Sequence, residues 1–505
     1  MNDQKSTDSP AVESEQAVET EESRFDAMRR RVGLVLGPAV FLLVLAMPFE
    51  QLTPEAHRLA AVISLVIVFW TTEALPLPVT SLLGPSLAIM MQVAPVRDAL
   101  APFANPLIFL FIGSFILAQA LFVHRVNERI AYGVLSWRFI GARPTRILIA
   151  YGALAAFLSA WMSNTATAAM LVPIGLSLIA FMEKEGKMPK GYGTALMLMT
   201  AYGCSRGGMA TPVGTPPNLI AIGMLSEQLD VRITFVEWMI IAVPISLVLM
   251  GIVFVYLNWT GNTGGVKEIP GAEQIIVERK AALGPWKPGE RNAIIAFGVT
   301  VVLWVGPGLL PLFLGREHPF AQSVLASIPE AVAALTGALL LFLLPISKTR
   351  RTTITWKQAA QIDWGTILLF GGGLSLGMMT ASTGLARVVG EGNTSLVPTS
   401  EITPLTFAAA LFTVVLTETM SNTAATNIAI PIVISIAQAA GVDPMIPAVS
   451  AGLAASVAVV LPVSSPPNAI VYASGRVPIT QMIKYGVLMD LVAVILVPIM
   501  VLAMV

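Results

Sequence analysis

Two short polar peptides within apolar sequence carry the clearest chemistry in this chain. Ser163-Asn164-Thr165 and Ser421-Asn422-Thr423 are near-copies, and each lies in an apolar stretch that leads to a proline (SNTATAAMLVPI and SNTAATNIAIPI). Neutral amide and hydroxyl groups are costly at bilayer depth unless they find a partner. A duplicated polar patch of this kind is the pattern left by internal repeats that meet around one substrate site.

A second duplicated feature follows each polar peptide. Val213-Gly214-Thr215-Pro216-Pro217-Asn218 and Val463-Ser464-Ser465-Pro466-Pro467-Asn468 interrupt apolar segments, and the paired prolines prevent helical hydrogen bonding there. Carbonyl groups freed at such breaks can coordinate a small cation, while free N–H groups and the positive end of a helix dipole attract an anion. Four breaks in duplicated order favour a binding site over ordinary kinks. Such a site suits a carboxylate or oxyanion substrate with sodium as counter-charge.

Charged residues inside the apolar segments leave several roles open. Arg206 precedes the first Pro-Pro pair by about two turns and could pair with a substrate carboxylate, replace a coupling cation, or bind backbone carbonyls at a seam. Glu418, three residues before the second Ser-Asn-Thr, is either a proton- or sodium-linked group or a tie to a neighbouring helix. Glu73 lies near the end of a span, where anchoring is the favoured role.

The composition indicates a polytopic membrane protein. The 505 residues are 55% hydrophobic and 12% charged, where a soluble domain has about 25% charged residues. Equal numbers of basic and acidic residues give no indication of nucleic-acid binding. The single cysteine, Cys204, excludes a disulfide framework and a cysteine metal site. The apolar spans contain no His-rich cluster, Ser/His pair or carboxylate dyad with usable spacing, so we expect no enzyme.

These motifs must be positioned by membrane helices of about 20 residues. Full-length apolar spans can be drawn near residues 32–49, 56–75, 79–96, 105–123, 233–257, 292–314, 322–345, 365–386 and 482–505. Residues 144–181 and 404–440 are interpreted as re-entrant hairpins with Ser-Asn-Thr at their tips. Residues 192–225 and 445–475 are interpreted as broken spans. The predicted fold is all-α, with about eleven crossings, two hairpins and two broken helices.

The distribution of basic residues predicts the orientation. Alternate loops hold most of them, and the other loops, predicted to be external, hold only Arg58, Arg97, Arg232, Arg316 and Arg387. The N-terminus is therefore predicted to be cytoplasmic and the C-terminus external. A hairpin that crossed fully would reverse every later loop and remove this bias. The first tip is thus predicted to be reached from the cytoplasm and the second from outside, as in inverted repeats.

Four regions follow from this pattern. Residues 1–31 are predicted to form a disordered acidic cytoplasmic tail, and residues 258–291 a polar cytoplasmic linker. Residues 32–257 form the first repeat, with its tip at 163–165 and its break at 213–218. Residues 292–505 form the second, inverted repeat, with its tip at 421–423 and its break at 463–468.

The paired Ser-Asn-Thr tips, the paired Pro-Pro-Asn breaks and the segment Thr72-Glu73-Ala74-Leu75-Pro76-Leu77-Pro78 resemble the divalent anion/sodium symporter family, over nearly the whole chain after about residue 30. The resemblance implies a homodimer in the inner (plasma) membrane, with a fixed scaffold and a transport domain that moves as an elevator. It implies symport of sodium with succinate, malate, fumarate, 2-oxoglutarate or citrate. Family members that transport sulfate, or that exchange dicarboxylates without sodium, keep two alternatives open.

The resemblance also implies specific ligands. Substrate carboxylates would contact the two tips and breaks, through Ser163, Asn164, Thr165, Thr215, Pro216, Ser421, Asn422, Thr423, Ser465 and Pro466. Two or more sodium ions would bind beside them, one at Ser159, Ser163, Asn164 and Gly214, another at Thr417, Met420, Asn422 and Ser464. This chain departs from the family at Ser464-Ser465 and at Arg206. In an exchanger, Arg206 would be the fixed charge partner.

Overall fold

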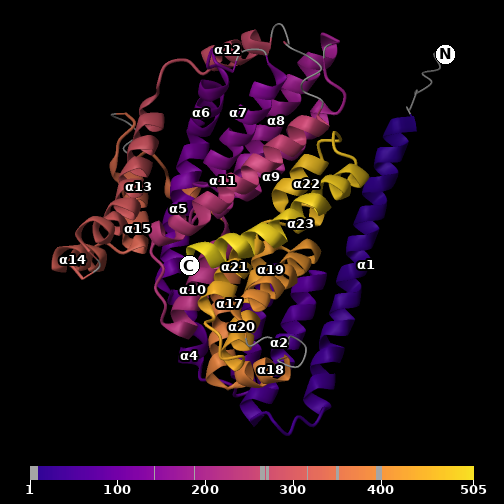
Figure 1. Cartoon of the computed structure of the whole chain (residues 1–505), viewed down its shortest axis with the longest axis vertical. Coiled ribbons are helices and arrows are strands. Elements are labelled where there is room, and N and C mark those ends of the chain that lie inside the picture. Colours follow the sequence, from indigo (N-terminus) through magenta and orange to yellow (C-terminus); the bar gives the residue numbers. More distant parts are fainter. Residues whose placement is uncertain are drawn as a thin grey trace.

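The computed structural model describes residues 10–140, 143–186, 188–261, 268, 272–315, 317–347, 352–393 and 401–505. All regular elements within these ranges are helices (Figure 1). The prediction of an all-α polytopic membrane protein is therefore confirmed. Residues 1–9 of the predicted tail lie outside the described residues.

The N-terminal half begins with six α-helices that precede the first hairpin and the first broken helix in the chain. They are α1 (Pro10–Ala46), α2 (Pro54–Thr72), α3 (Leu77–Met90), α4 (Val96–Leu100), α5 (Pro106–Val123) and α6 (Val126–Leu135). The hairpin consists of α7 (Pro144–Ser159) and α8 (Asn164–Lys184). The broken helix follows as α9 (Tyr192–Met209) and α10 (Pro216–Leu229), and α11 (Phe235–Thr260) ends this half.

The C-terminal half repeats the order of hairpin, broken helix and final span. After α12 (Ala272–Ala282) in the linker, the helices are α13 (Pro288–Leu314), α14 (Pro319–Ser327), α15 (Glu330–Leu343), α16 (Trp356–Ala359), α17 (Trp364–Ser382) and α18 (Leu385–Asn393). The second hairpin consists of α19 (Ile402–Thr419) and α20 (Asn422–Ala439). The second broken helix is α21 (Met445–Ala454) and α22 (Pro466–Tyr472), and α23 (Ile479–Met504) is last.

The helices differ in whether they are long enough to cross a bilayer. Among the described residues, 8 helices pass by length and composition, or up to 9 if α14 and α15, which are bent by 52°, form one span. The helices α3, α7 and α21 are apolar but shorter. The hairpin arms α8 and α19 are among those long enough, so length alone does not separate an arm from a crossing. The arrangement of the chain at each tip makes that distinction.

Helix α1 begins earlier than the composition predicted. It already starts at Pro10, so residues 10–31 are helical where disorder was expected. The physical reason is that Ala, Glu, Gln, Met and Arg dominate this stretch, and all are strong helix formers that can extend an adjoining span. Further along α1, a Cβ at Gly33 would collide with the Thr72 side chain, which shows how closely α1 packs on α2.

Helices from different halves pack directly on one another. Helix α5 packs along α15, and α17 packs along α3. A Cβ at Gly113 of α5 would lie 2.6 Å from the Ala334 backbone of α15, so a small residue is needed for this close approach. Toward the middle of the molecule, α21 and α19 lie beside α23, near α9 of the first half (Figure 1). The two hairpins and broken helices therefore belong to one packed unit.

Candidate functional site

Each Ser-Asn-Thr tip is the beginning of a helix. Ser163 is the N-cap of α8, and its Oγ accepts a hydrogen bond from the N–H of Ala166 at 3.2 Å. Ser421 is the N-cap of α20, and its Oγ accepts from the N–H of Ala424 at 3.3 Å. The backbone angles of the two serines agree within two degrees, at φ −62° and ψ 141° or 143°. The duplicated peptide is thus a duplicated structure, in which serine satisfies a free helix N–H.

The tip asparagines are oriented by hydroxyl groups from the preceding hairpin arm. Ser159 Oγ donates to Asn164 Oδ1. In the second hairpin, Thr417 Oγ1 lies 2.7 Å from Asn422 Oδ1 and 2.9 Å from the carbonyl oxygen of Ala455, with one proton for both. Because each amide oxygen is engaged, each amide NH₂ is left as the group that can donate to an anion.

The asparagine after each Pro-Pro pair closes the broken helix. Asn218 Nδ2 lies 2.9 Å from the carbonyl oxygen of Gly208 and 2.7 Å from that of Thr211. Asn468 Nδ2 lies 3.1 Å from the carbonyl oxygen of Leu461 and 2.9 Å from Ser464 Oγ. These side chains satisfy carbonyl groups left free at the end of the preceding helix. The sequence showed the duplicated motif, but it did not reveal this role of the asparagines.

The two tips and two breaks surround one cavity of about 280 Å³. All ten residues predicted to contact substrate line it: Ser163, Asn164, Thr165, Thr215, Pro216, Ser421, Asn422, Thr423, Ser465 and Pro466. The Ser465 hydroxyl is buried and makes no hydrogen bond within the described part of the chain, so it is free to bind a ligand. The volume is at the low end for small-molecule sites, which suits a compact ligand.

The cavity has further walls that the sequence did not identify. They are Leu77 and Pro78 at the start of α3, Phe115 of α5, and Asp363, Gly365, Thr366 and Leu369 at the start of α17. Asp363 is the N-cap of α17, and its Oδ1 accepts from the N–H of Thr366 at 3.0 Å. An aspartate directly before an apolar span with threonine three residues later is an N-cap pattern, which could have identified this position.

Half of the residues implied as sodium ligands line the same cavity, namely Ser163, Asn164, Gly214 and Asn422. The other four, Ser159, Thr417, Met420 and Ser464, are not among its lining residues. Gly214 packs among carbonyl groups, and an added Cβ would lie 2.5 Å from the oxygen of Gly208, 2.9 Å from that of Ser159 and 3.0 Å from that of Ala160. These oxygens belong to the C-terminal ends of α7 and α9, and carbonyl groups of helix ends that converge on one small space suit a sodium ion. In the described residues, no group of three or more His, Cys, Asp or Glu side chains could hold a metal ion.

The second implied cation site is less closely enclosed by backbone. Thr417 is hydrogen-bonded to the Asn422 side chain, while Ser464 Oγ donates to the carbonyl of Leu461 at 2.7 Å. Met420, which lies between α19 and α20, is buried and has extended backbone angles. These residues supply hydroxyl, amide and carbonyl oxygens, which are suitable sodium ligands.

The charged candidates do not line the cavity. Arg206 is 1% exposed, and its Nη1 donates to the carbonyl oxygen of Val457 at 2.9 Å. Glu418 accepts from the backbone N–H groups of Val460 and Leu461 at 3.0 and 3.1 Å. Both side chains therefore bind backbone groups of the second break. Three roles were open for Arg206, and its position agrees with the third, in which it binds a backbone carbonyl where two segments meet.

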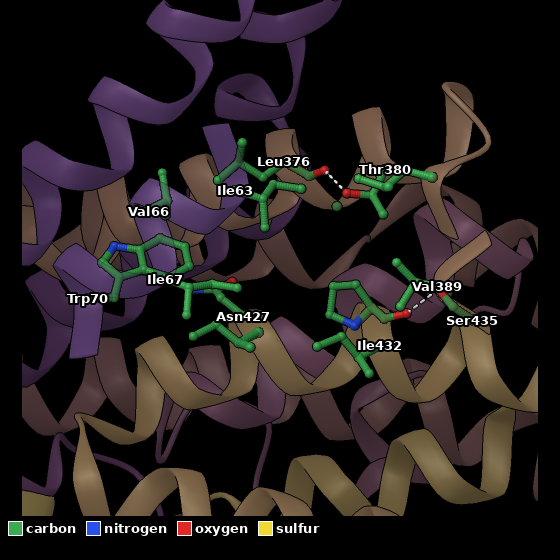
Figure 2. Close-up of a pocket in the computed structure, with 14 residues that line it drawn as sticks. Ile63, Val66, Ile67, Trp70, Leu376, Thr380, Val389, Asn427, Ile432 and Ser435 are labelled. Atoms are coloured by element: carbon green, nitrogen blue, oxygen red, sulfur yellow. Dashed lines mark hydrogen bonds between the residues drawn. The ribbon is translucent and has the colours of Figure 1, made fainter. Parts of the chain in front are cut away.

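A second cavity, of about 180 Å³, lies between α2 and α20 and has apolar walls (Figure 2). Thr380 and Ser435 contribute hydroxyl groups, but these donate to carbonyl groups of their own helices, at Leu376 and Pro431 (Figure 2). The cavity includes no residue of either tip. Asn427 also lines it, and its Nδ2 donates to the carbonyl oxygen of Leu369 at 3.3 Å.

Known proteins resemble this chain in sequence and in fold. A family model described as the sodium:sulfate symporter transmembrane region matches residues 29–504. The sodium-dependent dicarboxylate transporter SdcS of Staphylococcus aureus, in strains RF122 / ET3-1 and USA300, is 33% identical over 476 residues, 92% of this chain and 89% of the relative.

Two solved structures resemble the fold alone. MtrF of Neisseria gonorrhoeae has a TM-score of 0.54 at 14% identity, covering 83% of this chain and 85% of that one. The YdaH transporter of Alcanivorax borkumensis has a TM-score of 0.56 at 14% identity, covering 82% of this chain and 88% of that one.

Proposed function

This chain belongs to the divalent anion/sodium symporter family, and from that premise we propose that it transports small di- or tricarboxylates across the plasma membrane together with sodium. The single observation that carries the proposal is the cavity enclosed by both Ser-Asn-Thr tips and both Pro-Pro breaks. Its walls offer neutral hydroxyl and amide donors to an anion, while carbonyl oxygens beside it offer a place for cations. The family assignment also makes this chain a membrane transport protein and not an enzyme.

The substrate class follows from the relatives and from the cavity. The S. aureus relatives are named sodium-dependent dicarboxylate transporters. We infer that succinate, malate, fumarate, 2-oxoglutarate or citrate binds with one carboxylate near Asn164-Thr165 and another near Asn422-Thr423. The cavity volume of about 280 Å³ supports a ligand of this small size.

Sodium is proposed to bind at two sites, one in each half. The site at Gly214, with Ser159, Ser163 and Asn164, is supported by the carbonyl groups that converge there. The site at Thr417, Met420, Asn422 and Ser464 is supported by its oxygen donors. Bound sodium would neutralise the dicarboxylate, whose binding in a low-dielectric cavity is otherwise opposed by desolvation.

The position of Arg206 favours symport over exchange. A fixed counter-charge must face the substrate, but Arg206 does not line the cavity and donates to Val457 instead. The acidic side chains of Asp490 and Glu418 also act on it electrostatically. A cation that accompanies the substrate must then come from solution.

The cavity walls indicate the side from which it is reached. Leu77, Pro78, Asp363, Gly365 and Thr366 line it and lie in segments that the predicted topology places on the cytoplasmic side. We infer an inward-facing state, with the N-terminus in the cytoplasm and the C-terminus outside. Transport then requires the hairpins and broken helices to move as an elevator against a scaffold, which in a homodimer would be held at the subunit interface.

The test is uptake by purified protein in proteoliposomes. Labelled succinate, malate, fumarate, 2-oxoglutarate, citrate and sulfate are each offered with an inward sodium or choline gradient, to empty and to preloaded vesicles. We expect sodium-dependent dicarboxylate uptake into empty vesicles and none in protein-free liposomes. Uptake that requires internal substrate but no sodium would show exchange. Uptake of sulfate alone would show that sulfate, and not a carboxylate, is the transported substrate. Either result would overturn the proposal.

A further inference from the structure

The end of α9 bonds directly to the second broken helix. Arg206 Nη1 donates to the carbonyl oxygen of Val457 at 2.9 Å, and Ser205 Oγ donates to that of Ser456 at 2.7 Å. Both carbonyls lie in the open segment that follows α21. Two consecutive residues of the first repeat thus satisfy two consecutive carbonyls of the second.

Arg206 is itself firmly held. Its backbone carbonyl accepts from Ser246 Oγ of α11 at 2.6 Å, which fixes the end of α9 to a neighbouring helix. Among the described residues, its Nε and Nη2 make no hydrogen bond, so its charge depends on nearby carboxylates. Asp490 of α23 and Glu418 of α19 are the acidic side chains that act on it electrostatically. A buried guanidinium is tolerated only when its charge is compensated in this way.

The carboxylate of Glu418 continues the same arrangement. It accepts from the N–H groups of Val460 and Leu461, just beyond the carbonyls bound by α9. Asn468 binds the carbonyl of Leu461 and Ser464 Oγ from the other side. Side chains from outside the segment therefore fix the backbone that leads to Ser464 and Ser465 in the cavity.

Among the described residues, the first break receives no side-chain hydrogen bond from the second repeat. Its carbonyls are bound by Asn218 and by Trp238 Nε1, which donates to Met209 at 3.1 Å. Thr211 Oγ1 donates to Ala160 of the first hairpin. All of these residues are neutral and belong to the first repeat. The hydrogen bonding is therefore asymmetric: in the described part of the chain, side chains of the first repeat bond to the second break, and no side chain of the second repeat bonds to the first break.

We propose that Arg206 is a positioning residue through which the first cation site controls the dicarboxylate affinity of the second half of the cavity. The inference rests on the proposed sodium-coupled function. Arg206 is two residues before Gly208, whose carbonyl oxygen is one of the three that an added Cβ at Gly214 would meet in the proposed first cation site. A cation bound there orders the end of α9, and Ser205 and Arg206 at that end order the second break. A ligand that orders a shared element lowers the ordering cost for the next ligand, which gives positive coupling.

The experiment compares Arg206→Gln, Arg206→Lys and Ser205→Ala with wild type. Succinate binding is measured by calorimetry in detergent, and succinate KM in proteoliposomes, each at low and saturating sodium. The readout is the factor by which sodium lowers the Kd or KM. We expect Arg206→Gln to reduce this factor about tenfold, as for the loss of a charged hydrogen bond, and Ser205→Ala about threefold. Arg206→Lys should retain part of it, because lysine keeps the charge and a donor.

Arg129→Gln is the matched control. Arg129 is also largely buried and donates to backbone carbonyls, those of Leu283, Gly284 and Pro285, but these lie in the linker away from the cavity. We expect its loss to lower the melting temperature and to leave the sodium effect unchanged. If both buried arginines act only in folding, Arg206→Gln and Arg129→Gln should both lower the melting temperature and leave the sodium effect unchanged.

The outcomes distinguish a failure of sodium coupling from a failure of the positioning role of Arg206. Wild-type protein that binds succinate without any sodium effect would overturn the proposed function itself. Wild-type protein with a sodium effect that both Arg206→Gln and Ser205→Ala retain in full would overturn only the positioning role. If Arg206→Gln does not fold, Ser205→Ala and Arg206→Lys decide the question, because each removes less of the bonding at the second break.

Discussion

Gly214→Ala should weaken sodium binding more than it weakens the fold. The added Cβ would lie 2.5–3.0 Å from the carbonyl oxygens of Gly208, Ser159 and Ala160, so at least one of these backbone groups must shift. Forcing one extra carbon into a close-packed site costs about 1–3 kcal/mol. If that cost falls on the cation-bound state, the sodium affinity decreases about 5- to 150-fold.

The assay is the sodium dependence of succinate uptake in proteoliposomes, together with the melting temperature in detergent. Gly251→Ala in α11 is the control, because an added Cβ there meets no atom within 4 Å. We expect Gly251→Ala to match wild type in both measurements. Gly214→Ala should shift the sodium concentration for half-maximal uptake upward and leave the maximal rate at saturating sodium largely intact.

An unshifted sodium dependence in a correctly folded Gly214→Ala protein would refute the reasoning. It would mean that the carbonyl groups at this break close an ordinary helix turn and do not bind the coupling ion. Equal loss of activity at all sodium concentrations would also contradict it, because a change confined to the cation site can be overcome by more sodium.

Three further variants probe the same cavity. Thr417→Val removes the donor to Asn422 Oδ1 and to the Ala455 carbonyl, and should raise the succinate KM roughly tenfold. Thr413 bonds only within its own helix, so Thr413→Val should leave uptake unchanged. Ser465→Ala removes a hydroxyl without a partner in the described structure, so transport assays should show a higher succinate KM with no change in melting temperature. Its control, Ser464→Ala, breaks two hydrogen bonds and should lower the melting temperature. Asp363→Asn keeps a good N-cap but removes a negative charge from the cavity wall, so the succinate KM at low salt should fall, by up to about fivefold; an unchanged KM would place the carboxylate too far from the substrate.

The duplicated polar peptides could be located from sequence because their chemistry contradicts their surroundings. Amide and hydroxyl groups within apolar spans require partners, and the repeated order of tip and Pro-Pro break indicated that the partners would be shared. The structure does bring Ser163, Thr215, Ser421 and Ser465 to one cavity.

Other parts of the site could not be predicted because they depend on contacts between distant segments. The partner of Arg206 is a carbonyl group, which no residue type reveals, so its orientation away from the cavity was open until the helices were placed. Asp363 faces the cavity only because α17 packs along α3. By contrast, the bend of 52° between α14 and α15 does have a signal in the sequence, because Pro329 follows Ser327-Ile328 at the break, and the single span drawn over residues 322–345 passed over it.

The bonds between α9 and the second break also constrain biosynthesis. Ser205 and Ser456 are 251 positions apart, as are Arg206 and Val457. At about 5–20 residues per second, a ribosome needs roughly 10 to 50 seconds to supply the missing partners. During that interval the nascent chain holds a guanidinium that is costly to leave uncompensated in the bilayer. Insertion of α9 must therefore be delayed or assisted until the C-terminal helices emerge, and a chain that ends after α11 should be recognised as incomplete and degraded.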